Sequence, residues 1–139
     1  MNYLSVVDVE HVAYELAKAH LTWKEPIPDF STRFPGILEQ CLSAPRQTFD
    51  KKPLYHGLIG KASIFFYLMI KNHPFQNGNK RIAVMTLLLF LYENEKWLRL
   101  DSHQLYRFAK WVAESDARLK DAVVQAIELF LKQHLIARP

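Results

Sequence analysis

The residues best suited to chemistry lie in the short stretch 72–81, NHPFQNGNKR, which separates two strongly apolar segments. His73 carries an imidazole, a group that can take a proton from a hydroxyl at neutral pH. Gly78 has no side chain to keep a ligand from the backbone, and Lys80 and Arg81 place two positive charges at the start of an expected helix. Because the amides of a helix start also attract anions, the stretch predicts a phosphate site beside a proton acceptor.

Residue types alone leave an ordinary structural interpretation open. His-Pro and Asn-Gly pairs are common in tight turns between helices, and a Lys-Arg pair is common on a protein surface. On this interpretation Phe75 would hold the turn against the core, and the polar residues around it would only be solvated. Composition and spacing favour this interpretation, and the exact order of the residues is what changes the balance.

That order, from 73 to 81, resembles the signature of the Fic/Doc family: His, any residue, Phe, any residue, Asp or Glu, Gly or Ala, Asn, Gly or Lys, Arg. Five residues stand at their expected positions: His73, Phe75, Gly78, Asn79 and Arg81. Lys80 stands where AMP-transferring Fic members usually have glycine and where death-on-curing (Doc) toxins have lysine. Val84 stands where Fic enzymes usually carry another arginine, again as in Doc-like members. The resemblance covers roughly residues 35–100 and favours the Doc-like branch.

The resemblance implies a role for each matched residue. His73 would be the general base, and Phe75 would anchor the loop. The residues Gly78–Arg81 would bind phosphates, because the first two would face them and the two cations would neutralise their charge. The donor would be ATP or another nucleoside triphosphate, with Mg²⁺ at its phosphates.

The function implied is that of a Doc-like toxin of a toxin-antitoxin system. It would transfer a phosphate group from ATP to a hydroxyl side chain of a cytoplasmic target protein, such as a translation factor. Two alternatives stay open: an AMP-transferring Fic enzyme, and a catalytically weakened module of the same fold that binds a nucleotide or a partner. Asn77 supports the last of these, since it stands where the family usually has an acid that helps to bind Mg²⁺, and a hard dication prefers carboxylate oxygens.

A polar and aromatic stretch with prolines on both sides precedes the first of the two apolar segments. It reads as an exposed flap that can pair as a small hairpin around Asp50-Lys51. The resemblance implies that this flap holds a segment of the target by backbone pairing, a form of strand addition. The flap residues are Gln47, Thr48, Phe49, Asp50, Lys51 and Lys52.

Apolar residues recur at spacings of three and four through most of the chain, while alternation is nearly absent, so the sequence predicts an all-α protein. Helices are expected from Ser5–Asp8 to His20, from Pro35 through Leu42, over 58–72 and over 79–94, with two more after residue 101. An irregular connector is expected over 22–35, where three prolines lie. The helix over 79–94 is apolar on nearly all sides, which places it at the centre of the bundle.

Two local features of these helices bear on the site. The first helix is expected to turn five residues inward: Val9, Val12, Ala13, Leu16 and Ala17. The helix before the loop is expected to stop at His73, because Pro74 disfavours helical geometry at the residue before it. The imidazole would then face out of the bundle.

The length of the chain predicts one domain over residues 1–139, and the resemblance implies that this domain is Fic/Doc-like. Its longest apolar run is too short to cross a membrane, and no secretory signal is visible, so a cytoplasmic location is expected. The formal net charge is +4, but the cations are scattered and no nucleic-acid motif accompanies them, so no nucleic-acid partner is expected.

The sequence also predicts a partner that restrains the protein. Fic members are commonly silenced by a helix with Ser or Thr, three residues, and then Glu followed by Gly or Asn. No Ser or Thr in this chain has a glutamate four residues later. An active toxin would therefore need a small antitoxin in trans, whose segment folds as a helix beside Lys80 and Arg81. The alternative is that Asn77 already keeps the activity low and that no antitoxin exists.

Overall fold

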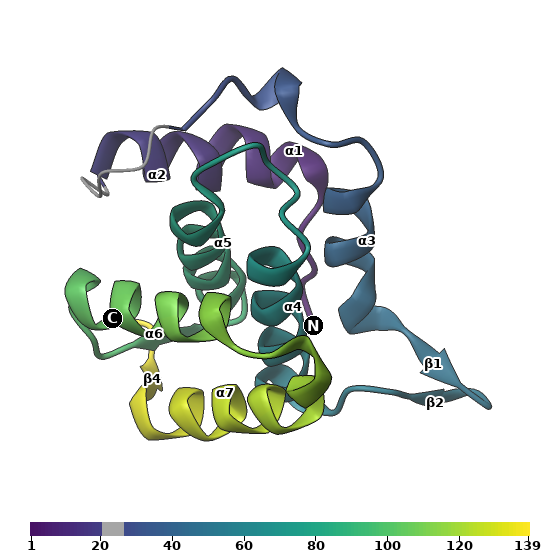
Figure 1. Cartoon of the computed structure of the whole chain (residues 1–139). Helices are drawn as coiled ribbons and strands as arrows, with labels where there is room; N and C mark the ends of the chain where they lie inside the picture. Colours follow the sequence, from purple (N-terminus) through teal and green to yellow (C-terminus); the bar gives the residue numbers. More distant parts are fainter. Residues whose placement is uncertain (21–26) are drawn as a thin grey trace.

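Two helices form the centre of the molecule, one on each side of the loop that carries His73. They are α4 (Gly57–Lys71) and α5 (Asn79–Glu93), and they pack against each other (Figure 1). The computed structural model describes residues 1–20 and 27–139. Helices dominate this part of the chain, and the strands in it are only two or three residues long. The all-α prediction is therefore confirmed.

Helix α5 is buried along most of its length, as its apolar sequence predicts. Its fully buried side chains include Ile82, Leu87 and Leu91. The helix packs against the N-terminal helix, α4, α6 and β3, so neighbours cover it on several sides. It begins after Gly78, whose positive φ of 74° places it in the left-handed region that favours glycine. The central helix is thus held at a fixed position directly after the loop.

The N-terminal helix is continuous but changes type along its length: α1 (Val6–Asp8), the π-helical η1 (Val9–Tyr14) and α2 (Glu15–His20). Ser5 caps it and forms a reciprocal capping box with Asp8. The inward face was predicted only in part, because Val12 and Leu16 are 36% and 38% exposed. The wider turn of the π segment shifts the register of the following residues, so that a regular spacing of three and four no longer marks one face.

The chain from residue 27 to 46 crosses to the far side of α4. It forms a short turn, η2 (Phe30–Thr32), then α3 (Ile37–Ser43) and a further turn, η3 (Ala44–Arg46). Helix α3 begins after Gly36, so Pro35 lies outside its first turn, which corrects the sequence prediction. Gly36 has a φ of 86°, and its amide donates to Glu39 Oε2 at 2.5 Å. Of the expected irregular connector, residues 22–26 lie outside the described residues.

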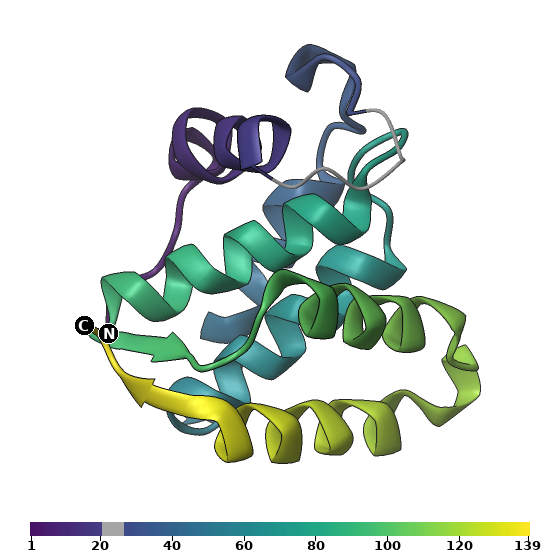
Figure 2. The same cartoon turned by 90° about the vertical axis from the view of Figure 1, so that its left-hand side faces the viewer.

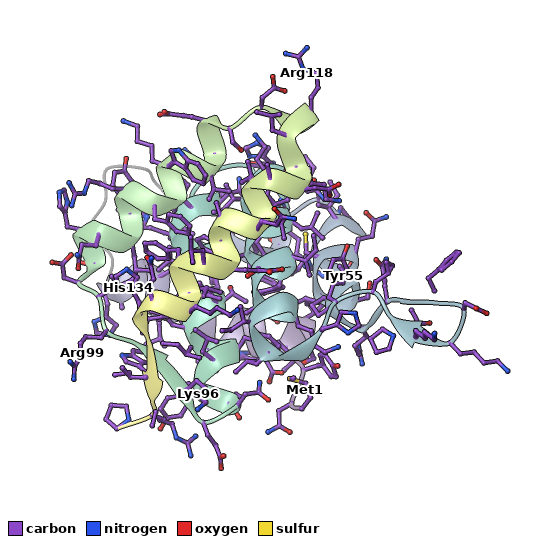
Figure 3. All side chains as sticks on the ribbon, turned by 90° about the horizontal axis from the view of Figure 1, so that it is seen from below. Met1, Tyr55, Lys96, Arg99, Arg118 and His134 are labelled. Carbon is purple, nitrogen blue, oxygen red and sulfur yellow. The ribbon has the colours of Figure 1, made fainter. Side chains whose placement is uncertain are left out.

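The flap is a two-stranded hairpin, as predicted. Strand β1 (Thr48–Phe49) pairs antiparallel with β2 (Lys52–Pro53). Asp50 and Lys51 form the turn with φ of 52° and 63°, the left-handed pair that a two-residue hairpin loop requires. Every residue of the hairpin is exposed, and the hairpin projects away from the bundle (Figures 1 and 3).

A second two-stranded ribbon was not predicted. Strand β3 (Lys96–Leu98) pairs antiparallel with β4 (Leu135–Ala137), between which the chain forms α6 (Ser102–Glu114), the turn η4 (Ala117–Leu119) and α7 (Lys120–His134). Strands this short cannot show a clear alternating pattern. In Figure 3, Lys96 and His134 lie at this ribbon, whereas Arg118 marks the other end of α7.

The molecule therefore has two distinct ends. Figure 2 shows the ribbon and both termini at one end, and the α4–α5 loop with the α6–α7 turn at the other. Between them lies a continuous core of apolar residues drawn from the helices. No helix in residues 1–20 and 27–139 is both long and apolar enough to cross a lipid bilayer.

Candidate active site

The loop between α4 and α5 carries the predicted catalytic residue. Helix α4 ends at Lys71, two residues earlier than the proline alone predicts, and Asn72 caps its last turn. His73 then takes a positive φ of 49°, a left-handed conformation that is uncommon for any residue other than glycine. The imidazole side chain is exposed. Such strained backbone is often found at functional sites, where the surrounding structure holds it in place.

Phe75 holds this loop against the core, as predicted, and is only 1% exposed. Its ring lies 5.7 Å from the ring of Phe30 and 6.4 Å from that of Tyr14, measured between centroids. The Tyr14 hydroxyl in turn donates to the carbonyl of Pro28. Burial, with a smaller contribution from Asp29 and Glu15, raises the pKa of Tyr14. This aromatic cluster fixes the loop to the N-terminal helix and η2.

Asn79 closes the loop with its side chain. Its Oδ1 accepts from the amide of Phe75 at 2.9 Å, and its Nδ2 donates to the carbonyl of Phe75 at 2.8 Å. Nδ2 also lies 3.5 Å from Nδ1 of His73, the outer limit of a hydrogen bond. At this length the contact places the imidazole beside Asn79 but is too weak to fix which ring nitrogen carries the proton. The side chain of Asn79, which was predicted to face phosphates, binds the loop, and its backbone amide lies at the helix start.

A cavity of about 240 Å³ opens beside this loop. It is lined by Ile70 at the end of α4, by His73, Gln76, Asn77, Gly78, Asn79 and Lys80, and by Ala113 of α6. The first amides of α5 have no acceptor within that helix, and its dipole is positive at this end. The half-buried Lys80 adds a full positive charge. The cavity is thus suited to bind a phosphoryl group close to an imidazole.

Two predicted site elements are not among the described residues that line this cavity. Arg81 is buried, with 6% of its surface exposed, and is not among the described residues that line the cavity. The flap, Gln47–Lys52, lies at the opposite end of α4 from His73 (Figure 1). Because α4 has 15 residues, its two ends are about 22 Å apart. The structure thus brings His73, Gly78, Asn79 and Lys80 together, and it does not bring the flap to them.

The oxygen donors that could hold Mg²⁺ are few. Asn77 Oδ1 accepts from the amide of Gly78 at 2.8 Å, which turns the oxygen toward its own backbone. No carboxylate is among the described residues that line the cavity. In residues 1–20 and 27–139, no three His, Cys, Asp or Glu side chains are grouped as metal ligands. The residues present therefore fit a metal ion only in part, with phosphate oxygens of a bound donor as its main ligands.

Sequence reasoning missed the residues that reach the loop from other parts of the chain. Tyr14 and Phe30 pack on Phe75, and Ala113 lines the cavity. Lys71 donates to the backbone carbonyls of Ala113 and Ser115. No short motif contains these residues. An aromatic at a buried helix position was the only available signal, and it marks core packing as often as a site.

Comparison with known families agrees with this geometry. The model of the Fic/DOC family matches residues 3–91, which include the N-terminal helix, the flap, the loop and most of α5. No curated protein and no solved structure matches the chain. Members of this family are typically protein-modifying transferases, which move AMP or phosphate to a target protein. Since the match spans well over half of the chain and contains the whole loop from His73 to Arg81, the chain belongs to the Fic/DOC family.

Proposed function

We propose that this protein transfers the γ-phosphate of ATP to a hydroxyl side chain of a cytoplasmic target protein, as a Doc-like toxin. The observation that carries the proposal is the position of His73 at a cavity whose other side is the start of α5 with Lys80. Lys80 stands where Doc-like members have lysine and AMP-transferring members have glycine. A lysine there fills space beside the phosphates and adds charge, which favours a donor held by its terminal phosphate.

The reaction follows from these residues. The target hydroxyl approaches His73 from solvent, since the imidazole is exposed. His73 takes the hydroxyl proton on its unprotonated ring nitrogen while the hydroxyl oxygen attacks the γ-phosphorus. The bond from that phosphorus to the β–γ bridging oxygen breaks, and ADP leaves with the electron pair. The helix start and Lys80 stabilise the negative charge on the phosphoryl oxygens, and Asn79 keeps the ring beside them. A bound Mg²⁺ would supply further charge neutralisation at the phosphates.

A double-label experiment tests the transferred group. The protein is incubated with cytoplasmic extract and ATP that carries its label either on the γ-phosphate or on adenine. We expect γ-label on one protein band and none from adenine. Adenine label on a band would contradict phosphate transfer and establish AMP transfer, in which the hydroxyl attacks the α-phosphorus and pyrophosphate leaves.

The role of His73 is tested by replacing it in the same assay. We expect His73→Ala to lower transfer by about 10²–10⁴-fold, the usual contribution of a general base. His134→Ala is the matched control, because this histidine lies at the far end of α7 (Figure 3). Unchanged transfer by His73→Ala would exclude its role as the base. The same pair compared for growth arrest on expression tests whether toxicity requires the chemistry.

A second candidate function is a nucleotide- or partner-binding module without turnover. It is favoured by Asn77, whose oxygen is bonded to the backbone and which replaces the usual acid. Such a module would bind ATP with no label transferred under either condition, which separates it from both enzymes.

The toxin proposal also predicts a partner. The chain lacks the Ser/Thr-to-Glu pattern of a self-inhibiting helix, so we propose a small antitoxin whose segment folds beside the start of α5. Growth arrest by this chain alone, relieved by co-expression of the adjacent reading frame, would support it. Normal growth at strong expression with no adjacent gene for a small acidic protein would contradict it.

A further inference from the structure

Ala113 is the part of the cavity wall that comes from far along the chain. The other described lining residues all lie within 70–80, at the end of α4, in the loop or at the start of α5. Ala113 lies in the last turn of α6, which ends at Glu114. The width of the cavity therefore depends on how the end of α6 is held against the end of α4. That contact joins two helices about 40 residues apart in the sequence.

A lysine makes this contact. The ammonium of Lys71, the last residue of α4, donates to the carbonyl of Ala113 at 3.2 Å and to that of Ser115 at 2.5 Å. These carbonyls lie at the C-terminal end of α6, where the helix dipole is negative and a cation is favoured. The Lys71 side chain is partly buried, so water screens these charge-assisted bonds less than it would on an open surface.

The turn that Lys71 holds is ordered by its own contacts as well. The amide of Ser115 donates to the carbonyl of Val112 at 3.1 Å, and its hydroxyl donates to the same carbonyl at 2.6 Å. Asp116 pairs with Arg118 at 2.7 Å. The hydrogen bonds from Arg118, with a smaller contribution from the Lys71 charge, lower the pKa of Asp116. Lys71 thus binds a preformed turn. Because Lys71 is only two residues before His73 in the sequence, this contact sets the position of the turn relative to His73.

We propose that Lys71 is a positioning residue of the donor site, which holds Ala113 as the wall opposite the start of α5 and so sets the width of the phosphate cavity. This inference rests on the proposed function, because it takes the phosphates of a nucleoside triphosphate as the ligand. The cavity is smaller than the roughly 300–1,000 Å³ that usually encloses a drug-sized ligand. In so small a cavity, each wall contacts a large share of the bound phosphate chain. A small outward shift of α6 would therefore separate Ala113 from the phosphates.

The first test measures binding of a non-hydrolysable ATP analogue with Mg²⁺ by calorimetry. We expect Lys71→Met to raise Kd about tenfold, and Lys71→Arg to stay within about twofold, since guanidinium can also bind two carbonyls. The matched control is Lys61→Met, because Lys61 also lies on α4 and donates to a carbonyl, that of Pro45 at 3.2 Å, away from the cavity. Equal Kd for Lys71→Met and the wild type, or an equal loss in Lys61→Met, would overturn the proposal.

The second test probes the wall itself. Ala113→Leu puts a branched side chain into the cavity and is expected to raise the Kd of the same analogue more than about tenfold. Ala117→Leu is the control, because the same change is made at an exposed position on the next turn. Unchanged binding by Ala113→Leu would show that this residue does not bound the donor site.

Hydrogen exchange separates failure of this inference from failure of the proposed function. In the free proteins, we expect the amides of residues 113–116 to exchange faster in Lys71→Met than in the wild type and Lys71→Arg. Equal exchange in Lys71→Met and the wild type would show that the Lys71 contact does not position the end of α6. Faster exchange together with a wild type that binds no analogue would instead overturn the donor site and the proposed function, while the contact itself would stand.

Discussion

At the scale of single residues, the loop combines a strained histidine with two residues that fix it. His73 has a positive φ, Phe75 is buried among aromatic rings, and Asn79 binds both polar groups of the Phe75 backbone. These contacts hold the imidazole beside the helix start before any ligand binds. Pre-organisation of this kind is what transfer chemistry requires, because the reacting groups need not be ordered during the reaction.

The metal requirement is predicted to depend on Asn77. Asn77→Asp adds a carboxylate beside the phosphate site, so the Mg²⁺ concentration at half-maximal activity should fall by about threefold to tenfold. Titration of Mg²⁺ in the labelling assay measures it. Gln133→Glu adds the same charge at an exposed position on α7 and should leave the value unchanged. Equal half-saturation for Asn77→Asp and the wild type would place Asn77 away from the metal.

The lone cysteine is predicted to be inert in the folded protein. Cys41 is fully buried, and burial raises its pKa to about 12 from 9.0. The folded state thus favours the neutral thiol, so this contribution to stability is complete below pH 9 and is lost as the pH rises toward 12. The unfolding free energy of the wild type relative to Cys41→Ala should fall by about 1.4 kcal/mol from pH 8 to pH 10. Urea unfolding at both values measures it, and a constant difference would contradict it.

At the scale of elements, the flap and the loop that carries His73 lie at opposite ends of one helix, α4. The hairpin ends at Pro53, shortly before α4 begins at Gly57, and His73 lies just beyond the last residue of this helix. The flap is therefore too far from the cavity to contact the atoms that react there. A target segment bound to the flap would have to extend along the length of α4 to bring its hydroxyl to His73.

The flap is predicted to act on target recognition and not on donor binding. Phe49 is 77% exposed at the end of β1, beside the hairpin turn, so Phe49→Ser should change the unfolding free energy by less than about 0.5 kcal/mol. We expect the KM for the target to rise about fivefold or more while the Kd of the ATP analogue stays constant, since a lost aromatic contact weakens docking alone. Leu129→Ser, at an exposed position on α7, is the control. An unchanged KM would exclude the flap as a docking element.

At the scale of the whole molecule, the two ends have different roles. The β3–β4 ribbon closes one end, where Arg138 donates to the carbonyl of Tyr92 at 2.9 Å and its amide donates to that of Glu95 at 3.0 Å. The cavity lies at the other end (Figure 2). The residues that contact Arg138 are not among the described residues that line the cavity, so stability and donor binding should be separable by truncation.

Removal of residues 135–139 tests this separation. The truncated protein loses β4 and the Arg138 contacts, and we expect its unfolding free energy to fall by about 2–4 kcal/mol, at roughly 1 kcal/mol for each lost hydrogen bond. Under conditions where it stays folded, the Kd of the ATP analogue should stay within about twofold of the wild type. Denaturant unfolding and calorimetry measure the two quantities. A large loss of donor binding in the folded truncated protein would show that the ends are coupled.

The sequence by itself determined the features that depend on neighbouring residues. The order of residues from His73 to Arg81 identified the family, the apolar run over 79–94 marked the central helix, and Asp50-Lys51 marked the hairpin turn. The signature is an order of neighbouring residues, while the helix and the turn follow from helical period and local backbone preference, so a short stretch of sequence expresses all three. The same holds for the burial of Phe75, the one large apolar residue in a polar loop.

Only the tertiary structure decided which distant residues complete the site. Ala113 and Lys71 meet because α6 packs beside α4, and Tyr14 reaches Phe75 because the N-terminal helix crosses the loop. The π-helical turn that exposes Val12 and the pairing of β3 with β4 were likewise invisible in the pattern. These outcomes depend on how whole helices pack and on which side-chain contacts then become available, and no local period specifies that choice.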